Sequence, residues 1–66
     1  MILIINGDSK ETKEGSSLLQ IMKELKIEDK VMAAAVNMNI VKKDSWAEYK
    51  PQDGDALELL HFVGGG

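Results

Sequence analysis

Three consecutive glycines, Gly64, Gly65 and Gly66, end the sequence and are its strongest candidate for chemistry. Because glycine has no Cβ, such a tail can enter a narrow channel and leaves the terminal carbonyl open to a nucleophile. Three extended residues reach about 10 Å, far enough to place the Gly66 carboxylate in another protein's active site. A free carboxylate is a poor electrophile, whereas an acyl-adenylate has a leaving group that a sulfur nucleophile can displace. The tail therefore indicates that the Gly66 carboxylate is the reacting group, and that other proteins activate it and convert it to a thiocarboxylate.

A frayed terminus or a cloning remnant would also end in glycines. Neither alternative explains why the three glycines directly follow a strongly apolar segment, with no polar linker between them. We therefore expect residues 1–63 to form one domain and residues 64–66 to form a flexible tail that inserts into a partner's active site.

The composition excludes several classes of protein. The 66 residues include no cysteine, so the chain has no disulfide, thiolate nucleophile or thiolate metal site. A net charge of −3 argues against binding to nucleic acid or to an anionic membrane, which requires clustered Lys and Arg. No apolar run is long enough to span a bilayer, and residues 1–5 lack the basic leader of a signal peptide. We expect a cytoplasmic protein.

No other group of residues supports catalysis or metal binding. His61 is the only histidine, and the chain has no cysteine to complete a metal site with it. Asp53 and Asp55 flank Gly54, but a turn before a strand explains them, and a full calcium loop is absent. We expect no metal, no bound cofactor and no catalytic residue, and hence a carrier protein rather than an enzyme.

One amphipathic helix and five short strands are predicted. Leu18, Ile21, Met22 and Leu25 recur at helical spacing, and Ser17 with Gln20 fits a capping box at the helix start. The predicted strands cover residues 1–5, 9–13, 31–36, 40–41 and 56–63. The alanines of residues 31–36 would suit a helix equally well.

A single helical turn is predicted before the last strand, capped by Asp44 or Ser45 and carrying Trp46 and Tyr49 as a lid on the core. The resulting order is two strands, the helix, two strands, the short turn and a last strand. One main helix packed across one face of a mixed sheet is an α+β roll.

The last predicted strand indicates a docking surface beside the tail. Side chains alternate across a strand, and Glu58 is costly to bury, so Leu57 and Leu59 should face the core. Leu60 and Phe62 then point outward, unless Phe62, the only phenylalanine, turns back into the core.

The first predicted strand is apolar on both faces, so Ile2 and Ile4 should also be exposed on the sheet face that the single helix leaves uncovered. We predict a partner-docking patch of Leu60, Phe62, Ile2 and Ile4. The same uncovered face makes weak self-association at high concentration an expectation.

A series of short motifs runs along the whole sequence in a fixed order up to the terminal glycines. They are Ile4-Ile5-Asn6-Gly7, Glu14-Gly15-Ser16-Ser17-Leu18, Ala35-Val36-Asn37 with Ile40-Val41, Trp46, Asp53-Gly54-Asp55, and Leu57-Glu58-Leu59-Leu60-His61-Phe62-Val63-Gly64-Gly65-Gly66. In these motifs the sequence resembles the ThiS family of thiamine-biosynthesis sulfur carriers, which belongs to the ubiquitin-like β-grasp proteins of the MoaD/ThiS superfamily.

The resemblance implies a β-grasp fold and a set of partners. An adenylating enzyme of the ThiF type would activate the Gly66 carboxylate with ATP and magnesium, and a cysteine desulfurase would supply a persulfide. The thiocarboxylate would then donate sulfur for thiazole formation on the synthase ThiG. The same glycine tail fits three alternative functions: a small subunit of molybdopterin synthase, a sulfur carrier for amino-acid synthesis, and a protein modifier joined to lysines through Gly66. A plain binding module with an irrelevant tail is a fourth.

Overall fold

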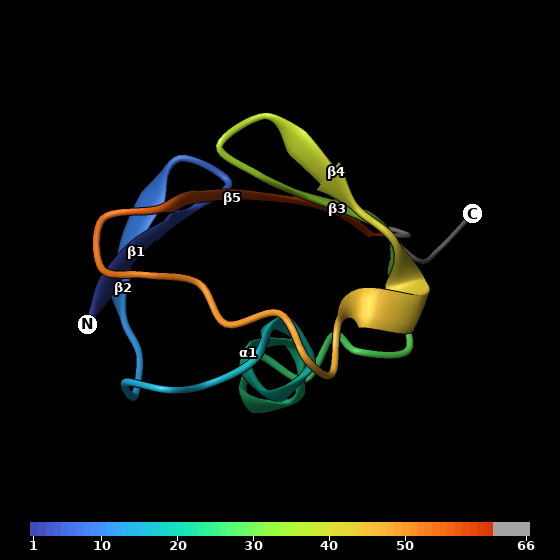
Figure 1. Ribbon diagram of the computed structural model, residues 1–66, viewed down its shortest axis with the longest axis horizontal. Helices are drawn as coiled ribbons and strands as arrows, with labels where there is room; N and C mark the ends of the chain where they lie inside the picture. The colour runs from blue at the N-terminus through green and yellow to red at the C-terminus, as the bar shows by residue number, and fades with distance from the viewer. Residues whose placement is uncertain (62–66) are drawn as a thin grey trace.

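The computed structural model describes residues 1–61 (Figure 1). Phe62, Val63 and the three glycines lie outside the described residues. The elements, in chain order, are β1 (Ile2–Ile5), β2 (Asp8–Glu11), α1 (Leu18–Glu24), β3 (Val31–Val36), β4 (Asn39–Val41), a 3-10 helix η1 (Lys43–Ser45) and β5 (Ala56–His61). No helix within residues 1–61 is long and apolar enough to cross a membrane.

The five strands form one mixed sheet in the order β2-β1-β5-β3-β4. β1 and β5 run parallel, and the other neighbouring pairs are antiparallel. The helix α1 lies across one face of this sheet (Figure 1). The architecture confirms the predicted α+β roll, and it places β5, the last described strand, at the centre of the sheet.

Both strand pairs at the sheet's edges are joined by two-residue turns. Asn6 and Gly7 connect β1 to β2, with φ of 50° and 87°, and Asn37 and Met38 connect β3 to β4, with φ of 49° and 71°. Two central residues with positive φ match the right-handed twist of a hairpin, and asparagine tolerates this conformation well. Because the second turn uses only two residues, β4 begins at Asn39, one residue earlier than predicted.

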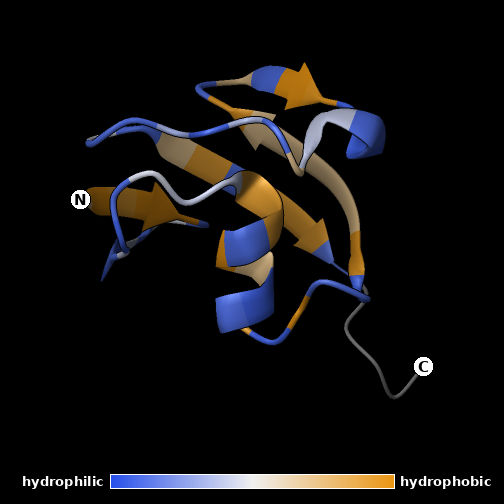
Figure 2. Ribbon diagram, turned by 60° about the horizontal axis from the view of Figure 1, so that its bottom comes forward, coloured by the Kyte–Doolittle hydropathy of each residue, from blue (hydrophilic) through white to orange (hydrophobic). Residues whose placement is uncertain are grey.

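The start of α1 confirms the predicted capping box. The backbone N–H of Gln20 donates to Ser17 Oγ (3.2 Å), and the backbone N–H of Ser17 donates to Gln20 Oε1 (2.9 Å). Leu18, Ile21 and Met22 are buried against the sheet. Hydrophobic and hydrophilic residues occupy different sides of the helix (Figure 2), as the period of its apolar residues requires.

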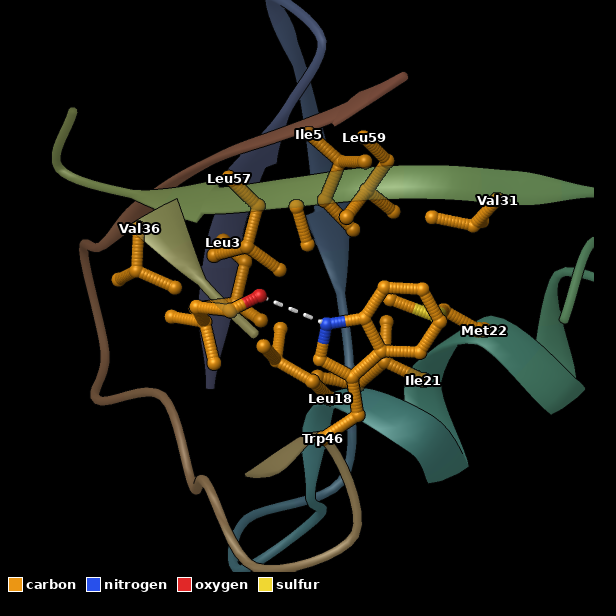
Figure 3. Close-up of a cluster of buried hydrophobic side chains, with 12 residues drawn as sticks. Leu3, Ile5, Leu18, Ile21, Met22, Val31, Val36, Trp46, Leu57 and Leu59 are labelled. Carbon is orange, nitrogen blue, oxygen red and sulfur yellow. Dashed lines mark hydrogen bonds between the residues drawn. The ribbon is translucent and has the colours of Figure 1, made fainter. Parts of the chain in front are cut away.

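The core lies between α1 and the inner face of the sheet (Figure 3). Its buried members are Leu3, Ile5, Leu18, Ile21, Met22, Val31, Ala34, Val36, Val41, Trp46, Leu57 and Leu59. Trp46 is only 2% exposed, and its indole Nε1–H donates to the carbonyl oxygen of Val41 (2.9 Å). The predicted lid role is confirmed for Trp46, whereas Tyr49 is 37% exposed.

The predicted cap of the short helical turn is wrong. Asp44 and Ser45 lie inside η1, which begins at Lys43, and Lys42 occupies the N-cap position without a side-chain hydrogen bond. A three-residue 3-10 helix offers little for a cap to stabilise. Burial of Trp46 and its bond to Val41 hold this segment in place instead.

Candidate functional site

The strand β5 leads directly to the predicted reactive tail. Its last residue, His61, lies five positions before Gly66 in the sequence. Gly64, Gly65 and Gly66 lie outside the described residues, so their insertion into a partner's active site stays a prediction. Since β5 is hydrogen-bonded to β1 on one side and to β3 on the other, the tail follows the central strand of the sheet.

Alternation along β5 follows the prediction. Leu57 and Leu59 are 1% and 3% exposed, whereas Glu58 is exposed and Leu60 is 64% exposed. Burying Glu58 without a partner would be costly, and this penalty fixes which face of β5 meets the core. Leu60 is therefore on the outer face of the sheet, as predicted, while Phe62 lies outside the described residues.

The outer face of the sheet is apolar from Leu60 across β3 to β4. Leu60 lies opposite Ala33 on β3, and Ala35, the next outward residue of β3, lies between Ile40 on β4 and the exposed Glu58 on β5. Ile40 is 73% exposed, so two large apolar side chains flank a floor of small alanines. We call Leu60, Ala33, Ala35 and Ile40 the tail-end patch, because Leu60 lies near the end of β5 that precedes the tail and the other three residues extend from it across β3 and β4.

Ile2 and Ile4 are exposed, as predicted, but they lie at the other end of the sheet. Ile4 is the Cα partner of Ala56, four residues before Leu60. At about 3.3 Å per residue, this places Ile4 about 13 Å from Leu60 along the strand direction, and Ile2 lies further still. The exposed carboxylate of Glu58 stands between them. Of the predicted patch of Leu60, Phe62, Ile2 and Ile4, the two isoleucines are thus not continuous with Leu60, because the parallel register of β1 and β5 separates them, and Phe62 lies outside the described residues.

The acidic residues before β5 brace a turn. Asp53 Oδ1 accepts from the backbone N–H of Ile2 (2.6 Å), and Asp55 Oδ2 accepts from the backbone N–H of Gln52 (2.8 Å). The turn interpretation is therefore confirmed. Within residues 1–61, no group of three or more His, Asp or Glu side chains is placed to hold a metal ion.

A cleft of about 630 Å³, which the sequence did not indicate, opens on the helix side of the molecule. It lies between α1 and η1 and is lined by Leu19, Lys23, Lys26, Glu28, Asp29, Lys43, Trp46 and Ala47. Lys43 Nζ stands 5.9 Å from the centroid of the Trp46 ring, within the range of a cation–π contact. Because the cleft is on the helix side, it is separate from the tail-end patch.

Comparison with known proteins places this architecture in a family. The model of the ThiS family matches residues 3–66, which is nearly the whole sequence and includes the three terminal glycines. This chain belongs to the ThiS family.

Individual relatives extend the family match. The sulfur carrier protein ThiS of Bacillus subtilis is 32% identical over 98% of this chain and 100% of its own length. The sulfur carrier protein ThiS of Escherichia coli is 27% identical over the full length of both chains. A thiazole synthase of Paramagnetospirillum magneticum is 35% identical over the whole of this chain, which spans only 20% of that protein's length.

Solved ThiS structures share the fold. The crystal structure of the thiamine biosynthesis protein ThiS from Geobacter metallireducens superimposes with a TM-score of 0.81, at 27% identity and full coverage of both chains. A solution structure of a thiamine biosynthesis protein from the same organism gives a TM-score of 0.75 at 25% identity, covering 100% of this chain and 88% of that one. The β-grasp fold that the resemblance implied is confirmed.

Proposed function

We propose that this ThiS-family chain is a sulfur carrier for thiamine thiazole synthesis, and that its Gly66 carboxylate becomes the sulfur-bearing thiocarboxylate. The observation that carries the proposal is the match, along essentially the whole chain, to two proteins named as sulfur carriers. The terminal glycines and the exposed apolar surface beside the end of β5 support it, because they provide a reagent and a neighbouring place for partners to dock.

The thiazole synthase relative supports a synthase of the ThiG type as the sulfur acceptor. In that protein, a segment similar to this entire chain is part of a polypeptide named as a thiazole synthase. Joining two proteins covalently raises their effective concentration, which is useful when one must repeatedly meet the other. We therefore assign the thiazole synthase as a partner of this carrier.

The proposed activation begins with ATP and magnesium bound by an adenylating partner of the ThiF type. A Gly66 carboxylate oxygen attacks the α-phosphorus, pyrophosphate leaves, and the carbonyl becomes an acyl-adenylate. The terminal sulfur of a persulfide, supplied through a cysteine desulfurase, then attacks the carbonyl carbon and releases AMP. A second thiol cleaves the sulfur–sulfur bond, forming a disulfide and freeing the Gly66 thiocarboxylate. The cysteine that carries the persulfide and the second thiol both belong to partners, because this chain has no cysteine.

In this scheme the chain binds no cofactor and catalyses no step, so it is a carrier and not an enzyme. Gly64 and Gly65 give the reach and clearance that Gly66 needs inside a partner's active site. The tail-end patch, together with Phe62, provides the docking surface for the adenylating enzyme. The cytoplasm, where ATP is abundant and thiols stay reduced, is the proposed location.

Complementation in bacteria tests the proposed pathway. We expect the full chain to restore growth without thiamine in a strain that lacks its own ThiS, and a chain lacking Gly65 and Gly66 to fail. A parallel strain that lacks the small subunit of molybdopterin synthase should not recover molybdoenzyme activity. Growth supported by the truncated chain would favour a plain binding module, and recovery of the molybdopterin strain alone would favour the other carrier class.

A further inference from the structure

Two asparagine side chains hold β5, one on each of its sides. Asn6 directly follows β1, and Asn37 directly follows β3, and these two strands flank β5 in the sheet. Each asparagine is the first residue of a two-residue turn, with φ of 50° and 49° respectively. The two sites are thus alike in local geometry but differ in where they hold β5.

The Asn6 amide replaces a peptide group at the point where β1 turns away from β5. Backbone pairing of the two strands ends at Ile5 and Leu57, and the Asn6 N–H then donates to the Leu57 carbonyl (2.9 Å). Beyond that point, Leu59 N–H donates to Asn6 Oδ1 (2.8 Å), and Asn6 Nδ2 donates to the Leu59 carbonyl (3.1 Å). A primary amide offers one acceptor and a donor, as a backbone peptide does, so the side chain extends the parallel ladder from Leu57 to Leu59, two residues further along β5.

On its other side, Leu59 pairs in regular register with Ala34 of β3, and the pairing becomes irregular only beyond Leu60. Val31 pairs with His61 and Ala33 pairs with Leu60, with a register shift that leaves Met32 between them. A bulge of this kind locally disrupts the ladder. On the β1 side, the Asn6 side chain is the contact that fixes Leu59, the residue immediately before the exposed Leu60.

Asn37 holds the opposite end of β5. Its Oδ1 accepts from the Ala56 N–H (3.0 Å), its backbone N–H donates to the Ala56 carbonyl (2.8 Å), and its Nδ2 donates to Asp55 Oδ1 (3.0 Å). Ala56 is the first residue of the strand, far from the tail. Asn37 therefore serves as an internal comparison: the same residue type, in the same backbone conformation, at the tail-distal end.

We propose that Asn6 is a positioning residue for activation of the tail. By holding both backbone polar groups of Leu59, it fixes the direction of the strand end that carries Leu60 and leads to Gly66. The adenylating enzyme then meets a docking residue and a tail attachment that are already ordered, and it loses less conformational entropy on binding. The inference rests on the proposed function, and Asn6 acts through the β5 backbone without touching the reacting carboxylate.

The matched variants Asn6→Gly and Asn37→Gly test the proposal. Glycine adopts φ near +50° without strain, so each variant keeps its turn and its backbone N–H bond while losing two side-chain hydrogen bonds. We expect amide hydrogen exchange at Leu59 to accelerate at least roughly tenfold in Asn6→Gly and to stay unchanged in Asn37→Gly, because protection reports local opening. The KM of the adenylating enzyme for Asn6→Gly should rise roughly three- to tenfold with kcat unchanged, the size expected for a lost hydrogen bond.

Asn37→Gly should lose about as much thermal stability as Asn6→Gly, but the adenylating enzyme should have a KM for it close to that for the wild type. Asn6→Asp provides a second variant, because it keeps the acceptor for Leu59 N–H but sets a carboxylate against the Leu59 carbonyl, and it should also raise KM. Two results would overturn the positioning role but not the proposed function. One is that all variants have the KM of the wild type, and the other is that KM rises with the loss of thermal stability in Asn37→Gly as much as in Asn6→Gly. A wild-type chain that is not adenylated would instead overturn the proposed function, and the positioning role with it.

Discussion

At the scale of single residues, positive φ values mark where this chain accepts a backbone conformation that glycine usually provides. Lys26 has φ of 61° at the end of α1. Its N–H donates to the Lys23 carbonyl, and the N–H of Ile27 donates to the Met22 carbonyl (both 3.0 Å). This is the Schellman pattern, in which the residue at the Lys26 position is usually glycine because a Cβ is disfavoured there. The sequence therefore gives no signal of where the helix ends.

Replacing this lysine by glycine should stabilise the protein. We expect Lys26→Gly to raise the free energy of unfolding by about 1 kcal/mol, because it removes the left-handed strain. The control Lys23→Gly removes the same charge from the same cleft but places glycine inside α1, and it should destabilise by about 1 kcal/mol. Urea unfolding followed by the fluorescence of Trp46, the only tryptophan, measures both. A loss of stability in both variants would contradict the strain at Lys26.

Trp46 shows how a single polar atom fixes an irregular segment. Trp46→Phe keeps an aromatic ring in the core but removes the indole donor to the Val41 carbonyl. We expect a loss of about 1–3 kcal/mol, because a buried carbonyl loses its partner and the smaller ring leaves space unfilled. Thermal unfolding followed by far-UV circular dichroism measures this loss. Wild-type stability in the variant would mean that packing of the ring alone holds η1 in place.

At the scale of elements, the patterns that repeat along the sequence predicted the long helix and the buried face of the last strand. The spacing of Leu18, Ile21 and Met22 identified α1, and alternation around Glu58 identified the buried face of β5. Both patterns express burial of one face of a regular element, which is the main contribution to its stability. η1 has no such period, since it is three residues long, and its cap was predicted wrongly for that reason.

The capping box at the start of α1 gives a prediction at this scale. Ser17→Ala removes the oxygen that accepts from the Gln20 N–H, and the helix is only seven residues long. We expect a loss of about 1 kcal/mol, typical of a missing N-cap, which corresponds to about 4–8 °C in Tm for a domain of this size. Ser9→Ala, at an exposed position of β2, should change Tm by much less. Equal shifts for the two variants would contradict the importance of the cap.

At the scale of the whole molecule, the apolar outer face is divided between the two ends of the sheet. The sequence correctly indicated that Ile2, Ile4 and Leu60 are exposed, but exposure depends only on alternation within each strand. Whether these residues meet depends on strand order and register, which involve pairings between distant parts of the chain. The contribution of Ile40 and the two alanines to the tail-end patch was missed for the same reason.

Aspartate substitutions at the two ends distinguish their roles. Leu60→Asp places a charge in the tail-end patch, and we expect it to weaken binding of the proposed adenylating partner by about tenfold or more while the fold is retained, because an unpaired charge would be desolvated at the interface. Ile4→Asp, at the far end of the same face, is the matched control and should bind nearly as the wild type does. Calorimetric titration measures both affinities, and equal losses would show that docking extends over the whole face. The predicted self-association should weaken in both variants, which sedimentation measures.

The central claim, that Gly66 carries the chemistry, is tested most directly by intact-mass spectrometry. The purified chain is incubated with ATP, magnesium, a ThiF-type adenylating enzyme and a cysteine desulfurase with cysteine as the sulfur source. We predict a product whose mass differs from the starting chain by one oxygen replaced with one sulfur, located at Gly66 by fragmentation, and absent without ATP. An unchanged mass under conditions in which a known ThiS protein is converted, or adducts joined to lysine side chains in place of the thiocarboxylate, would contradict the account.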